Sequence, residues 1–181
     1  LASSISNLTI SNGVKLDIST VDARIVESFD TGVAGQVITT YVSAMEETNS
    51  TTAIYEQNAA QGPLAAKFSS VNTRKMTQTR TFPRSQDWTS YDTLNIYVKS
   101  SSATHSPVTL VIKNTAGAEL ASFLLLAADE ITTISNPTTN GFALKQFAIT
   151  GFTRNDIASI QFSTDQITNE TESFSVDTVY L

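Results

Sequence analysis

Polar and aromatic side chains recur at every second position of several short segments, which is the spacing of one face of a β-strand. In the segment SQDWTSYDTLNIYVKS, Leu94, Ile96 and Val98 point one way, whereas Asn95, Tyr97 and Lys99 point the other. A tyrosine ring can stack on the C–H face of a sugar ring, and amide and guanidinium groups can hydrogen-bond sugar hydroxyls. The outward candidates of this kind are Gln78, Arg80, Asn95, Tyr97 and Gln161. We expect Tyr97 to be the stacking residue; the alternative is an ordinary polar sheet face.

Catalytic chemistry has little support in the sequence. His105 is the only histidine and lies in a turn rich in Ser, Thr and Pro, where we expect a solvated side chain. No nucleophile-elbow motif is present, and none of the 17 acidic residues lies in a recognisable catalytic frame. The sequence therefore predicts that the chain is not an enzyme.

Composition and charge narrow the possible partners. The 181 residues carry a formal net charge of −6, and the 11 basic residues are scattered, which argues against a nucleic-acid partner. The longest apolar run, Ala121–Ala128, is too short to cross a membrane. The chain has no cysteine, which excludes disulfides and thiolate sites but leaves the compartment open. Because it starts at Leu1, we expect a processed product or a domain of a larger protein.

The elements that must position these side chains are short strands. Only 15% of residues are charged, and the polar surface is built mainly from Ser, Thr, Asn and Gln, which suits sheets and turns. Alternating segments recur every 8 to 14 residues, without a convincing amphipathic helix. We expect an all-β fold, a two-sheet antiparallel β-sandwich of the jelly-roll type rather than an up-and-down barrel. The predicted strands are 24–29, 64–71, 76–82, 94–99, 108–113, 119–126, 141–149, 157–163 and 173–181, with weak signals between 32 and 63.

Two of these expectations concern boundaries. The strand that begins at Met76 is expected to stop before Pro83, because proline cannot donate to a ladder. Residues 1–24 are expected to form an N-terminal hairpin or linker extension around Asn12-Gly13, and residues 25–181 the sandwich domain.

Four motifs resemble a known family. They are VESFD at 26–30, DWTSY at 87–91, FTRNDIASIQF at 152–162 and VDTVYL at 176–181. In this order they resemble the jelly-roll carbohydrate-binding modules attached to bacterial glycoside hydrolases, which also occur in phage tail and baseplate adhesion proteins. The resemblance covers most of residues 25–181 and rests on short motifs, so it bears on the fold more than on the function.

The resemblance also implies roles for particular residues. An acid at the end of the first strand and the aspartate of the last strand help to hold a structural calcium ion in that family, and Asp30 and Asp177 match those positions. The alternative is that Asp30 caps a turn and that Asp177 is a solvated strand residue. Trp88, the only tryptophan, is expected to pack under the edge of the sandwich rather than to serve as a sugar platform.

These observations lead to one favoured function and two alternatives. The favoured one is a non-catalytic carbohydrate-binding module that recognises a cell-surface or cell-wall polysaccharide, within a larger extracellular protein or on the virion surface as part of a phage tail adhesion protein. Its partner would be a polysaccharide or oligosaccharide, with no nucleic acid and no membrane insertion. The alternatives are a structural or assembly sandwich domain without a sugar ligand and, less favoured, a glycan hydrolase.

Overall fold

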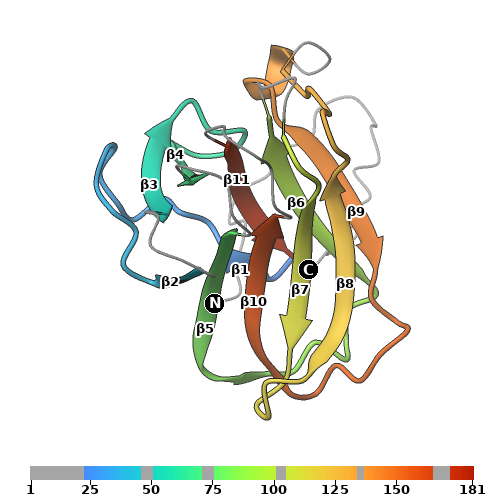
Figure 1. Cartoon of the computed structure of the whole chain (residues 1–181). Coiled ribbons are helices and arrows are strands. Elements are labelled where there is room, and N and C mark those ends of the chain that lie inside the picture. The colour runs from blue at the N-terminus through green and yellow to red at the C-terminus, as the bar shows by residue number, and fades with distance from the viewer. Residues whose placement is uncertain (1–22, 46–50, 71–75, 101–104, 134–136, 165–171) are drawn as a thin grey trace, which may run out of the picture.

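The protein is a sandwich of two antiparallel β-sheets. The computed structural model describes residues 23–45, 51–70, 76–100, 105–133, 137–164 and 172–181. Figure 1 shows the two sheets stacked face to face, with β10 and β7 in front of β11 and β6. Within these ranges, no helix is long and apolar enough to cross a membrane.

The sheet centred on β11, here the β11 sheet, has the strand order β3-β4-β11-β6-β9, and β1 pairs additionally with β11. Its strands are β1 (Ile25–Glu27), β3 (Thr51–Gln57), β4 (Leu64–Ser70), β6 (Thr93–Lys99), β9 (Ala143–Ala148) and β11 (Glu172–Tyr180). The sheet centred on β10, here the β10 sheet, has the order β2-β5-β10-β7-β8. Its strands are β2 (Tyr41–Met45), β5 (Met76–Gln86), β7 (Val108–Lys113), β8 (Glu119–Leu126) and β10 (Ile157–Thr164). A single 3-10 turn, η1 (Pro137–Thr139), precedes β9 in the described part of the chain. The expected two-sheet antiparallel sandwich is confirmed.

The core lies between the sheets and is built by the alternation expected from the sequence. Leu94, Ile96 and Val98 of β6 are fully buried. An aromatic cluster joins the two sheets: the ring of Phe68 on β4 lies 5.3 Å from the rings of Phe162 on β10 and Phe174 on β11, centroid to centroid. This shared cluster makes the two sheets one packing unit.

Trp88 belongs to this core. Its ring is fully buried and lies edge-on to Phe82 at 6.4 Å, and its backbone N–H donates to the carbonyl of Arg154 at 2.8 Å. The Asp87 carboxylate next to it accepts hydrogen bonds from the Thr89 hydroxyl and N–H, which lower the pKa of Asp87. The interpretation of Trp88 as part of the scaffold is therefore confirmed.

One strand boundary differs from the expectation. β5 continues through Pro83 to Gln86 instead of stopping before the proline. The pairing of β5 with β10 jumps from Thr81↔Ser159 to Gln86↔Ile157, so Pro83 lies in an irregular stretch of the ladder. A proline is tolerated there because no regular ladder hydrogen bond requires its missing N–H. Of the N-terminal hairpin or linker extension expected at residues 1–24, residues 1–22 lie outside the described residues.

Candidate functional site

The outer face of the β11 sheet carries a row of polar side chains on three adjacent strands. Lys67 of β4 pairs with Ser175 of β11, which in turn pairs with Lys99 of β6. Their neighbours in each strand, such as Phe68 and Val98, point into the core, so strand alternation forces this row outward. Two lysines therefore flank one serine in a cross-strand row on the outer face of the sheet.

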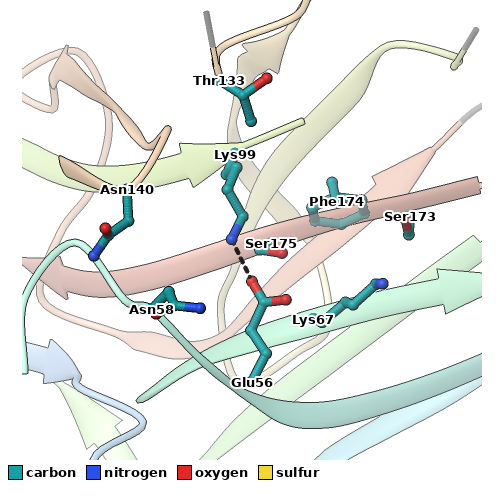
Figure 2. Close-up of a pocket in the computed structure, with 9 residues that line it drawn as sticks. All are labelled: Glu56, Asn58, Lys67, Lys99, Thr133, Asn140, Ser173, Phe174 and Ser175. Atoms are coloured by element: carbon teal, nitrogen blue, oxygen red, sulfur yellow. Dashed lines mark ion pairs between the residues drawn. The ribbon is translucent and has the colours of Figure 1, made fainter. Parts of the chain in front are cut away.

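A hollow of about 400 Å³ lies over this row (Figure 2). The strands supply its charged side chains, and the segments that follow β3 and precede β9 add two amides. The residues that line it are Glu56, Asn58, Lys67, Lys99, Thr133, Asn140, Ser173, Phe174 and Ser175. Hydroxyl, amide, ammonium and carboxylate groups thus face one space.

The charges in this pocket are only partly balanced. The Lys99 ammonium lies 2.8 Å from Glu56 Oε1, with about a fifth of each side chain exposed to solvent. The same ammonium lies 4.4 Å from the centroid of the Phe142 ring, a cation–π contact. Lys67 makes no ion pair with any residue in the described part of the chain. The described residues that line the pocket therefore carry a formal charge of +1, whereas the whole chain carries −6.

A second, smaller core holds one wall of the pocket. Ala59, Ala65 and Phe142 are buried together on the outer face of the β11 sheet, and the ring of Tyr97 packs against them. The Asn140 amide donates to the carbonyl of Ala59 at 2.8 Å, which ties the turn before β9 to the segment after β3. The two loops cover part of the sheet face and leave the hollow beside them.

Asp177 of β11 holds the segment after β3 by a hydrogen bond. Its Oδ2 accepts the Gln61 N–H at 2.7 Å, and its Oδ1 accepts the N–H and hydroxyl of Thr178. Thr178 has a φ of 24° and forms a bulge, because the pairing of β11 with β6 shifts between Asp177 and Val179. Burial raises the pKa of Asp177, and the hydrogen bonds from Gln61 and Thr178 oppose that rise.

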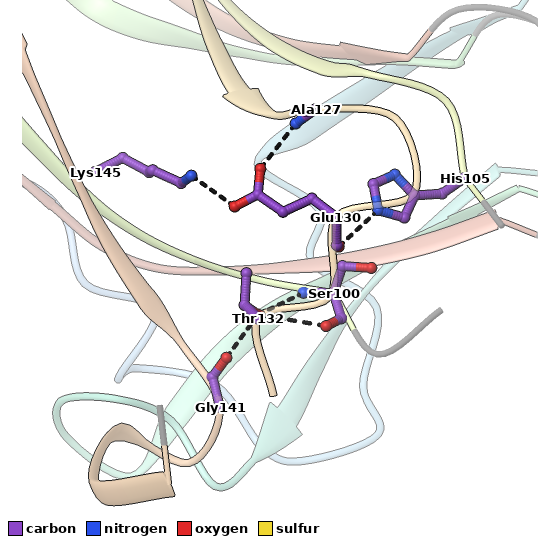
Figure 3. A network of polar contacts seen from close by, with 7 residues as sticks. All are labelled: Ser100, His105, Ala127, Glu130, Thr132, Gly141 and Lys145. Carbon is purple, nitrogen blue, oxygen red and sulfur yellow. Dashed lines mark hydrogen bonds and ion pairs between the residues drawn. The ribbon is translucent and has the colours of Figure 1, made fainter. Parts of the chain in front are cut away.

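A polar network holds the segment that contributes Thr133 (Figure 3). The Thr132 hydroxyl donates to the carbonyl of Gly141 at 2.6 Å and accepts the Ser100 N–H at 3.0 Å. This network joins the end of β6 to the turn before β9. Hydrogen bonds thus hold the segment with Thr133 to the end of β6 and to the turn before β9.

His105 lies in the same network, and the expectation of a solvated side chain is wrong. Its side chain is buried, with Nδ1 2.8 Å from the carbonyl of Ser106 and Nε2 2.8 Å from that of Glu130. Carbonyl oxygens only accept, so the tautomer of the ring decides which of the two carbonyls receives its hydrogen bond. Glu130 in turn accepts from Lys145 at 2.7 Å. The histidine therefore links the segment at 105–106 to the turn that contains Glu130.

The ligand-binding candidates on β6 lie on the expected sheet face but beside the pocket. The Tyr97 hydroxyl accepts from the Gln61 side chain at 3.1 Å, and the ring lies half-buried under the loop. Asn95 is 7% exposed, and its oxygen accepts from Gln146 at 2.8 Å. Neither lines the hollow, so Tyr97 presents no free ring face there for stacking.

The candidates on β5 point the other way. Gln78 is fully buried, and Arg80 Nε lies 3.2 Å from Glu27 Oε2, so the expectation that they face solvent is wrong. Both share the inward register of Met76, another fully buried residue of β5. Gln161 does face outward, but on the β10 sheet, so the structure does not bring the five candidates together.

Sequence reasoning missed most of the pocket. It placed Lys99 on an outward face but did not select it, and it did not select Glu56, Lys67, Ser173 or Ser175. The alternation of the inward Ala66 and Phe68 implies that Lys67 points outward, and this was the signal by which the sequence could have indicated a pocket residue. Which outward residues become neighbours depends on strand pairing, which the sequence did not provide.

The two aspartates of the expected calcium site, Asp30 and Asp177, both lie against the segment Gln61-Gly62. Asp30 is exposed and its carboxylate lies where Gly62, at a φ of 70°, would carry a Cβ, so this position requires glycine. Both oxygens of Asp177 already accept hydrogen bonds, whereas Ca²⁺ needs about six to eight oxygen ligands. No group of three or more acidic or histidine side chains that could hold a metal occurs among the described residues. Calcium binding stays a prediction.

Known proteins resemble this chain in fold. No protein-family model matches it, and no curated protein matches it in sequence. A family 11 carbohydrate-binding module from Clostridium thermocellum, in complex with a β-1,3-1,4-mixed-linked tetrasaccharide, has a TM-score of 0.59 at 14% identity, over 88% of this chain and 94% of the module.

Two larger proteins contain a similar unit. An arabinose-bound α-L-arabinofuranosidase has a TM-score of 0.58 at 11% identity, over 84% of this chain and 25% of the enzyme. The enzymatically active domain of tailspike protein 4 of bacteriophage CBA120 has a TM-score of 0.50 at 11% identity, over 78% of this chain and 19% of the tailspike. The β-sandwich implied by the sequence motifs is confirmed: the chain has the fold of the family 11 carbohydrate-binding modules.

Proposed function

We propose that the chain is a non-catalytic carbohydrate-binding module and that the pocket over Lys67, Ser175 and Lys99 is its glycan site. The observation that supports this is a hollow large enough for a sugar unit, lined by hydroxyl, amide and charged groups on a rigid sheet. The match over nearly the full length of a module solved with a tetrasaccharide supports the same function.

The geometry does not favour hydrolysis at this pocket. Glycoside hydrolysis by the usual mechanisms needs two carboxyl groups that flank the bond. Among the described residues that line the hollow, Glu56 is the one carboxylate, and it is paired with Lys99. An ion-paired carboxylate at the base of a polar hollow is suited to hold a ligand hydroxyl rather than to transfer a proton.

We also propose that the module is part of a larger extracellular or virion protein. The arabinofuranosidase and the tailspike each contain a unit of this fold in a chain that is about four to five times as long. Weak binding at one module would then gain strength from several copies on one assembly.

A glycan array followed by calorimetry tests the function. Lys99→Met is expected to weaken binding of the best glycan about tenfold or more, because it removes the ammonium and leaves Glu56 unpaired. Gln161→Ala, on the outer face of the β10 sheet, is the control and is expected to bind as the wild type does.

Two results would contradict the proposal. Absence of binding to every glycan by the intact parent protein would favour the alternative of a structural or assembly domain. Loss of binding in Gln161→Ala but not in Lys99→Met would place the site on the opposite sheet.

A further inference from the structure

Lys67 is the residue of the pocket that a neutral sugar would leave without a partner. It lies on β4 in the same cross-strand row as Ser175 and Lys99, and its side chain is partly buried. Glu56 lies 2.8 Å from Lys99, whereas Lys67 makes no ion pair in the described part of the chain. An ammonium group without an ion pair in the described part of the chain thus lines the pocket and is available to a ligand.

The described residues of the pocket offer no exposed aromatic ring on which a neutral sugar could stack. Phe174 is the one aromatic residue that lines the hollow within the described ranges, and it is only 3% exposed. The Phe142 ring is fully buried and already faces the Lys99 ammonium. Stacking on a sugar face therefore contributes little here, and hydrogen bonds and charge must supply the recognition.

We infer that this pocket binds an acidic glycan, one with a carboxylate or sulfate group that reaches the Lys67 ammonium. The inference rests on the proposed function. The two lysines on either side of Ser175 repel each other, and among the described lining residues one carboxylate, Glu56, neutralises only Lys99. An anionic group in the row supplies the missing charge, while Asn58 and Asn140 remain to bind neutral hydroxyls. The chain otherwise carries an excess of acidic residues, so this preference arises from the pocket and not from the overall charge.

The experiment compares two matched pairs of polysaccharides by affinity electrophoresis and calorimetry. Polygalacturonate is compared with its fully methyl-esterified form, and sulfated carrageenan with agarose; the two pairs distinguish a carboxylate from a sulfate. The wild type is expected to bind the acidic member of at least one pair about tenfold more tightly, because charge-assisted hydrogen bonds are about twice as strong as neutral ones. The preference is expected to shrink as the salt concentration rises.

Two variants separate the pocket from general charge. Lys67→Gln is expected to abolish the preference without changing the melting temperature, because the side chain makes no ion pair among the described residues. Lys113→Gln, on β7 of the β10 sheet, removes the same charge elsewhere and is expected to keep the preference.

The outcomes distinguish the inference from the function. Binding only to the neutral polysaccharides, or an equal effect of the two lysine variants, would overturn the inference and leave the proposed function standing. Failure to bind any glycan on the array and any of the four polysaccharides would overturn both.

Discussion

The two outer faces of the sandwich differ, although one core supports both. The outer face of the β11 sheet presents the long charged side chains Lys67, Lys99 and Glu56, and loops cover part of it. The outer face of the β10 sheet presents short hydroxyl side chains such as Thr79 and Thr81 beside the exposed apolar side chains Val42 and Leu124. The first face has the depth and the charges of a binding site, whereas the second mixes hydroxyl and apolar side chains.

The difference shows that sheet alternation alone does not create a site. Both faces are polar for the same reason, which is that the opposite register fills the core. On the β11 sheet, Ala59 and Phe142 bring two loops onto the face, and the hollow lies beside these loops. Asp177 and Asn140 fasten those loops by hydrogen bonds to Gln61 and Ala59.

The largest expected effect removes the support that both faces share. Phe68→Ala is expected to lower the free energy of unfolding by about 3–5 kcal/mol, because it leaves a cavity among the rings of Tyr41, Phe162 and Phe174. Denaturant titration measures the loss. Phe68→Leu, which keeps the site apolar, is expected to lose less. A loss below about 1 kcal/mol in Phe68→Ala would mean that the sheets do not depend on this cluster.

The second prediction concerns the loop that distinguishes the β11 sheet. Asp177→Asn is expected to lower the free energy of unfolding by about 1–3 kcal/mol, because the new NH₂ group faces N–H or O–H donors that lose their acceptor. Asp92→Asn, with 80% of the Asp92 side chain exposed, is the matched control and is expected to change little. Equal stability of the two variants would show that the loop is held by apolar packing alone.

The third prediction concerns pH and the network behind the pocket wall. Burial would raise the pKa of Glu130, but hydrogen bonds from Lys145 and the Ala127 N–H, together with the charges of Lys145 and His105, lower it overall. Because the pKa is lower in the folded protein, the ionised carboxylate stabilises the fold at pH values above its ordinary pKa of 4.5. This stabilisation is lost as the pH falls through the lowered pKa of the folded state. Because the side chain is 31% exposed, we expect no more than about 0.5 kcal/mol.

Melting temperatures of the wild type and Glu130→Gln measure this contribution. The wild type is expected to melt slightly higher than the variant at pH 7, and the difference is expected to vanish near pH 3. A difference that grew in acid would contradict the assigned direction of the shift.

The fourth prediction concerns the outer face of the β10 sheet, where a substitution is expected to change little. Gln161→Ala is expected to change the free energy of unfolding by less than about 0.5 kcal/mol, because the residue lies outward on β10. Asn140→Ala, by contrast, is expected to weaken glycan binding, since its amide lines the pocket and fixes the loop. Chemical denaturation and calorimetry of both variants measure the contrast, and equal binding losses would remove the distinction between the two faces.

The smallest effect is expected from a chelator. If Asp30 and Asp177 hold a calcium ion, the melting temperature is expected to be slightly higher in calcium than in EDTA, because hydrogen bonds from Gln61 and Thr178 already hold Asp177 without the ion. The same melting temperature in calcium and in EDTA would contradict the calcium prediction.

Sequence patterns predicted strands well where one face is strongly apolar. Leu94, Ile96 and Val98 lie in the core as expected, because a shift by one residue would expose all of them. In β5 the pattern was ambiguous, since Thr77 and Thr79 alternate with the polar Gln78 and Arg80. The buried Met76 places Gln78 and Arg80 on the inward side of β5. Glu27 of β1 forms an ion pair with the partly buried Arg80.

The residue pattern along the chain predicted an antiparallel sandwich with Trp88 in its scaffold and one polar face on each sheet. Local alternation carries that information, because burial of apolar side chains sets the orientation of every residue in a strand. The same pattern did not predict that Lys67, Ser175 and Lys99 are neighbours or that two loops wall a pocket beside them. Such contacts depend on which distant strands pair and where loops pack, and no local pattern encodes either.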